Sequence, residues 1–145
     1  MPRTLASRLL LLAALALAAC DSDGADLLGL NVSELGHDPA MLAGTWELVS
    51  STSAGYGALP TTTPVAPGTE SLTFRADGTL EVYQNGRLSE STVWAIEELA
   101  DVGPAPLLRI GTEADYRRLF FGVTPTRLYF DGRPSDGNLA EYARR

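Results

Sequence analysis

The sequence predicts an all-β domain that folds as an eight-stranded antiparallel up-and-down barrel, with a short N-terminal helical turn before its first strand. Three observations support this prediction. Apolar and polar residues alternate with a period of two after Gly44, as they do in strands with one buried face. The dipeptides Asp77-Gly78 and Asn85-Gly86 are typical of tight hairpin turns. No helical pattern longer than a turn or two interrupts the alternation.

The helical turn is expected to begin at Asp38-Pro39, because an aspartate N-cap followed by proline is a common helix start. It should end at Gly44, where the first strand begins. Asp77-Gly78 should form a type I′ turn, because that turn requires positive φ angles. The expected strands cover residues 45–52, 70–76, 79–84, 88–98, 107–110, 116–123, 128–130 and 139–145.

Closing eight such strands into a barrel removes the exposed edges of the sheet. An eight-stranded barrel is either filled by its own side chains or holds one small ligand. A sandwich of two sheets is the main alternative, and the number of strands does not exclude it. The length of the chain fits a single domain.

The first nineteen residues have the organisation of an export signal. Arg3 and Arg8 precede an apolar run over 9–19, which ends in small residues suited to cleavage. The run is too short to span a bilayer, which needs about 20 residues. Leu17-Ala18-Ala19-Cys20 resembles the lipobox of bacterial lipoproteins, and this implies that Cys20 becomes the lipidated N-terminus. The alternative is an ordinary secretory peptide followed by an unrelated cysteine.

A lipidated Cys20 predicts three segments: a lipoprotein signal peptide over 1–19, a lipid-anchored acidic tether with a partly ordered strap over 20–38, and the barrel domain over 39–145. The expected location is the bacterial cell envelope, on the outer membrane or another periplasmic face. Cys20 is the only cysteine in the chain. We therefore expect the domain to fold without a disulfide.

The charge of the chain argues against a nucleic-acid partner. Removing residues 1–19 leaves nine arginines and eighteen acidic residues, so the formal net charge falls from −7 to 9 − 18 = −9. Binding to phosphate requires positive groups that displace counterions. We expect a monomer that contacts the membrane through its lipid anchor.

The segment Leu42-Ala43-Gly44-Thr45-Trp46-Glu47-Leu48 resembles the Gly-x-Trp opening of lipocalins, and more closely the Leu-x-Gly-x-Trp-x-Leu start of bacterial lipocalin-like domains. The resemblance covers most of residues 40–145. It implies that Trp46 forms the floor of the barrel and that Arg144 stacks on its ring, with Arg145 as second choice. The chain lacks the lipocalin disulfide, the Thr-Asp-Tyr motif and the long C-terminal helix.

The segment 53–69 is a candidate lid, because structureless loops of this length often cover binding sites. In lipocalins the corresponding loop lies over the open mouth of the barrel. This resemblance places Tyr56, Leu59 and Val65 at the mouth, and Trp94 is a further candidate there. A loop that covers no ligand is an equal alternative.

No pattern in the chain indicates catalysis, a cofactor or a metal site. His37 is the only histidine and has no cysteine partner, so the usual zinc site cannot form, and we expect it on the surface. Glu97 and Glu98 should point to opposite faces of a strand. Arg117 and Arg118 could contact an anionic head group, or point to opposite faces of one strand. We therefore expect that the protein is not an enzyme.

These observations favour a membrane-anchored, lipocalin-like lipoprotein that binds a small hydrophobic or amphiphilic ligand. The alternative is a solid barrel that serves as a protein-interaction module, as an accessory factor or inhibitor would. An apolar cavity of roughly 300 Å³ or more that opens beneath the loop favours ligand binding. A filled interior favours the interaction module.

The lipid anchor can be tested with the substitution Cys20→Ser. Without the thiol, no acyl chains can be attached there, and two or three chains are what make such anchoring effectively permanent. We expect the variant to leave the membrane fraction in a cell fractionation experiment. Continued membrane association would show that the lipobox interpretation is wrong.

Overall fold

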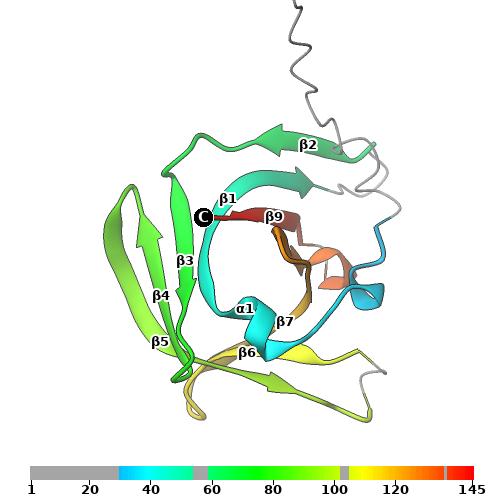
Figure 1. Ribbon diagram of the computed structural model, residues 1–145. Helices are drawn as coiled ribbons and strands as arrows, with labels where there is room; N and C mark the ends of the chain where they lie inside the picture. The colour runs from blue at the N-terminus through cyan, green and yellow to red at the C-terminus, as the bar shows by residue number, and fades with distance from the viewer. Residues whose placement is uncertain (1–29, 54–58, 102–104, 136) are drawn as a thin grey trace, which may run out of the picture.

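The computed structural model describes residues 30–53, 59–101, 105–135 and 137–145. Strands dominate this part of the chain (Figure 1). A 3-10 turn, η2 (Val32–Glu34), and the helical turn α1 (Pro39–Leu42) come first, and η3 (Arg133–Ser135) precedes the last strand. The strands are β1 (Gly44–Ser53), β2 (Thr61–Pro64), β3 (Glu70–Phe74), β4 (Thr79–Gln84), β5 (Arg87–Glu97), β6 (Leu107–Gly111), β7 (Tyr116–Val123), β8 (Arg127–Asp131) and β9 (Leu139–Arg144).

Eight of these strands close into an antiparallel barrel. The strands from β3 to β9 follow one another in chain order, β3 pairs with β1, and β9 also pairs with β1. Figure 1 shows the resulting ring, with α1 lying across it. The all-β up-and-down barrel predicted from the sequence is confirmed. The sandwich alternative is wrong, because the ladder between β1 and β9 joins the two ends of the sheet.

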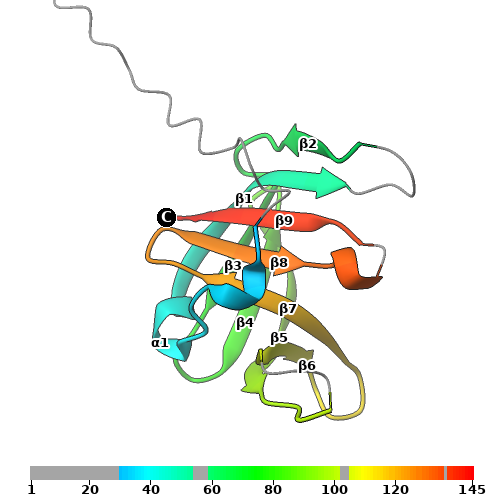
Figure 2. The same cartoon turned by 90° about the vertical axis from the view of Figure 1, so that its right-hand side faces the viewer.

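The strand β2 was not predicted. It lies within the segment expected to be a loop, and it pairs with Ser50–Ser53 at the end of β1. Figure 2 shows this hairpin at the edge of the molecule. All four residues of β2 are exposed, so the strand has no buried face and its Thr-Thr-Thr-Pro sequence shows no alternation of apolar and polar residues.

The two hairpin dipeptides form different turns. Asn85 and Gly86 have φ angles of 51° and 74°, and positive φ at both central residues is what a type I′ turn requires. The type I′ turn predicted at Asp77-Gly78 is wrong, because only Gly78 has a positive φ. The Asp77 carboxylate accepts a hydrogen bond of 2.9 Å from the backbone N–H of Thr79. A short polar side chain that bonds two residues ahead is typical of such turns.

The helical turn α1 closes one end of the barrel. Asp38 caps it as predicted, because its carboxylate accepts a hydrogen bond of 2.8 Å from the N–H of Ala40. Leu42 at the end of α1 is fully buried in the core. The indole N–H of Trp46 donates to the carbonyl of Leu42 at 2.8 Å. The last turn of α1 and the start of β1 therefore form one packed unit.

Part of the predicted tether packs on the barrel. Val32 in η2 is buried against Leu139 of β9. Gly36 forms an isolated antiparallel bridge with Val123 of β7, whose N–H donates to the Gly36 carbonyl at 2.8 Å. The folded domain therefore begins at least as early as these contacts, before the expected boundary at Pro39.

The closed end generates a stability prediction for Trp46→Ala. The Trp46 side chain has no exposed surface, and deleting a buried tryptophan removes both its transfer free energy and its packing. We expect a loss of roughly 3–5 kcal/mol in the free energy of unfolding, measured by urea denaturation. Leu88→Ala is the control, because Leu88 is 55% exposed. Equal losses for the two variants would contradict the placement of Trp46 in the core.

Candidate functional site

At the closed end the guanidinium of Arg144 lies over the ring of Trp46, with its Cζ 4.2 Å from the ring centroid. The Nε–H of Arg144 donates to the carbonyl of Pro125 at 2.8 Å, and Nη1 donates to that of Ala43 at 2.9 Å. Gly44 has a φ of 128°, and a Cβ atom there would come within 2.8 Å of Nη1. The glycine of the Gly-x-Trp motif thus makes room for the arginine. These contacts pack the closed end around the buried ring of Trp46.

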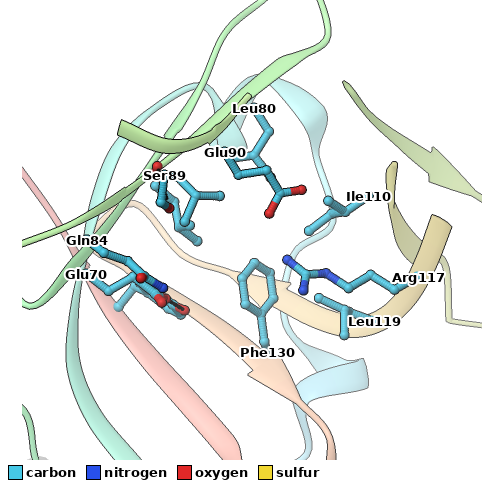
Figure 3. A pocket seen from close by; sticks show the side chains of 12 residues that line it. Glu70, Leu80, Gln84, Ser89, Glu90, Ile110, Arg117, Leu119 and Phe130 are labelled. Atoms are coloured by element: carbon cyan, nitrogen blue, oxygen red, sulfur yellow. Dashed lines mark hydrogen bonds between the residues drawn. The ribbon is translucent and has the colours of Figure 1, made fainter. Parts of the chain in front are cut away.

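The opposite end of the barrel contains a cavity of about 330 Å³ (Figure 3). Antiparallel pairing brings the starts of β3, β5 and β7 and the ends of β4, β6 and β8 to this end, away from α1. The apolar lining consists of Leu72, Leu80, Val82, Ile110, Leu119 and Phe130, with Tyr142 beside them. The polar lining consists of Glu70, Gln84, Ser89, Glu90 and Arg117.

Strand alternation decides which arginine faces the cavity. Arg117 and Leu119 of β7 both line it, because residues two apart on a strand share a face. Arg118 points the other way, and its Nε lies 2.8 Å from a carboxylate oxygen of Glu97. The second oxygen of Glu97 binds Arg109 at the same distance. Glu97 therefore has a structural role on the outside of the barrel.

Tyr142 and Glu70, which both line the cavity, are joined by a short hydrogen bond. The Tyr142 hydroxyl donates to the Glu70 carboxylate at 2.6 Å. Burial raises the pKa of Tyr142 far above its usual value, and the hydrogen bond to Glu70 raises it further. The phenol consequently remains a neutral donor, which fixes the Glu70 side chain at the rim.

Three of the four residues predicted at the mouth, namely Leu59, Val65 and Trp94, do not line the cavity. Leu59 is 89% exposed, and neither Leu59 nor Val65 lines the cavity. The expected position of Trp94 is wrong, because its ring packs edge-on against Phe74 at 5.5 Å and its N–H donates to the Arg75 carbonyl. These contacts hold Trp94 beside the turn between β3 and β4, at the closed end. Cys20 and Tyr56 lie outside the described residues.

The polar lining residues were missed except for Arg117, which was a candidate for a head-group contact. A signal for them exists in the sequence. Glu70 is two residues before buried Leu72, and Gln84 is two residues after buried Val82. Polar residues at inward positions near the end of a strand therefore mark the rim of this barrel. The register between strands is needed to show that these residues meet.

His37 is half-buried against the barrel. Its ring packs edge-on against Phe121, with 5.0 Å between the ring centroids. Within the described ranges, no group of three or more histidine, cysteine or acidic side chains is arranged to hold a metal ion. The same part of the chain contains no helix that is long and apolar enough to cross a membrane.

The chain has no significant match among the family models, the curated proteins or the solved structures with which it was compared. The cavity and the sequence motifs therefore provide the basis for assigning a function. An apolar interior with a polar rim is the usual arrangement of a small-molecule site.

The cavity wall generates a prediction for Tyr142→Phe. This substitution removes the hydroxyl that donates to Glu70, and a hydrogen bond to a charged group contributes about 1.5–3 kcal/mol. We expect a loss of stability in that range by chemical denaturation. Tyr83→Phe is the matched control, because Tyr83 donates to Glu81 at 3.0 Å, where Arg75 also binds the same carboxylate. If Tyr83→Phe and Tyr142→Phe lose the same amount of stability, burial does not strengthen the hydrogen bond between Tyr142 and Glu70.

Proposed function

We propose that this protein is a lipoprotein of the bacterial cell envelope whose lipocalin-like barrel binds a small hydrophobic or amphiphilic ligand. The observation that supports this proposal is the cavity of about 330 Å³, which has an apolar floor and a polar rim. Small-molecule pockets usually measure roughly 300–1,000 Å³. The volume therefore favours a small ligand over a large one.

The closed end supports the same proposal. Trp46 and Arg144 fill that end of the barrel with side chains, whereas the opposite end retains free volume. A ligand would bury its apolar part on Leu80 and Phe130 and leave its polar part near the charged rim. An amphiphile fits both parts of the cavity. Its apolar part would contact the apolar floor, and its polar part would find at the rim the hydrogen-bonding partners that a buried polar group needs.

Membrane attachment is proposed from the lipobox resemblance at Cys20. Acyl chains on this residue would hold the barrel at a membrane surface. The residues between Cys20 and η2 would separate the barrel from the lipid. A ligand that partitions into membranes would then be available close to the cavity.

An interaction module is the second candidate function. The observation that favours it is β2, which forms the last strand on its side of the sheet within the described residues. A free strand edge can pair with an extended segment of another protein. Such a module would not need the cavity, so ligand binding distinguishes the two functions.

Ligand binding can be tested with the neutral fluorescent probe N-phenylnaphthylamine, whose emission rises in apolar surroundings. We expect the purified barrel to bind it and Leu119→Trp to weaken binding at least tenfold, because the larger side chain fills the cavity that Leu119 lines. Val93→Trp is the control, because Val93 is 45% exposed and does not line the cavity. Mass spectrometry of protein extracted from native membranes should then reveal a bound amphiphile. No probe binding, or equal effects of both tryptophan variants, would contradict the proposal.

A further inference from the structure

A gap in strand pairing lies beside the cavity, in the side of the barrel. β6 pairs only with Trp94–Glu97 of β5. The first part of β5, over Arg87–Val93, is therefore paired with β4 alone within the described residues. In Figure 1, β4 and the first part of β5 lie on the left of the ring, and β6 lies at its bottom, next to the last part of β5.

A second hollow of about 350 Å³ lies in this gap. It is lined by Glu90 and Thr92 of β5 and by residues of the turn between β6 and β7, including Asp115. Three residues line both this hollow and the inner cavity, namely Glu90, Ile110 and Arg117. The two hollows are therefore adjacent, with one apolar and two charged side chains at their junction.

The two charged residues at the junction form no ion pair with any other residue that the structure describes. Six arginines in the described part of the chain form ion pairs within 4.0 Å, and Arg117 is not one of them. Glu90 likewise forms no ion pair with another described residue. Figure 3 shows the two side chains extending into the cavity from opposite walls. Arg117 thus offers hydrogen-bond donors to an anion, and Glu90 offers acceptors to a cation.

The other charges of the site are consistent with a ligand that carries both signs. Glu70 already accepts the hydrogen bond from Tyr142, so it is less available to a ligand. Asp115 lines only the outer hollow and adds a second carboxylate on that side. A purely anionic head group would meet these carboxylates, and a purely cationic head group would meet Arg117.

We propose that the site binds an amphiphile with a zwitterionic head group, held at the lateral gap between Glu90 and Arg117, with its apolar tail in the inner cavity. This proposal rests on the proposed ligand-binding function and adds the chemical class of the ligand. The tail would occupy the space lined by Leu80, Leu119 and Phe130. The anionic part of the head group would bind Arg117, and its cationic part would bind Glu90. A simple anion or a simple cation could bind only one of the two.

Three probes with the same octyl chain test the proposal: octyl sulfobetaine, octyl sulfate and octyltrimethylammonium, each used below its micelle concentration. Their affinities are measured by displacement of N-phenylnaphthylamine from the barrel. We expect the zwitterion to bind most tightly. Arg117→Gln should weaken binding of the sulfobetaine and the sulfate by about two- to fivefold. Glu90→Gln should weaken binding of the sulfobetaine and the ammonium by the same factor, as expected for ion pairs of exposed side chains.

Arg118→Gln is the matched control, because Arg118 is next in the chain and faces outward to Glu97. It should leave all three affinities unchanged. Equal binding of the three probes, or equal effects of Arg117→Gln and Arg118→Gln, would overturn the zwitterion assignment while leaving the ligand-binding function intact. Failure of the barrel to bind N-phenylnaphthylamine would overturn both proposals.

Discussion

The pairing of β9 with β1 is the constraint on which the rest of the barrel depends. This ladder places Arg144 opposite Trp46, so the last strand of the domain completes the floor beneath the first. The guanidinium then donates to backbone carbonyls before β1 and between β7 and β8. Three segments distant in the chain are thereby joined around one buried indole. Without this closure, β9 and β1 would be edges of an open sheet.

The closed end is packed with side chains, whereas the opposite end of the barrel contains the cavity. The short β6 covers only the last part of β5, and a second hollow that shares lining residues with the cavity lies beside the uncovered part. Alternation along β7 brings Arg117 into that space and sends Arg118 out to Glu97. The same strand therefore contributes one arginine to an outer ion-pair network and another to the candidate site. A difference of one position in the sequence separates the structural role from the proposed functional one.

Local patterns predicted the elements well where each strand has one buried face. The alternation around Leu72 and Phe74 indicated β3, and Asn85-Gly86 indicated the hairpin after β4. Prediction failed for β2, whose residues are all exposed and therefore show no alternation. Prediction also failed for Trp94. An alternation with a period of two indicates which face of the sheet a side chain occupies, but it does not indicate how far along the barrel axis the side chain lies. The packing of Trp94 on Phe74 sets its position along the barrel axis.

The sequence by itself determined the number and order of the barrel strands, the helical turn at Asp38-Pro39 and the resemblance around Cys20 and Trp46. These features depend on residues close together in the chain, where alternation, capping and turn geometry act. The tertiary structure alone decided the closure of β9 on β1, the contact between Tyr142 and Glu70, and the lateral gap between β5 and β6. Each of these depends on the register of strands far apart in the chain, and that register is fixed only when the core packs and the sheet closes.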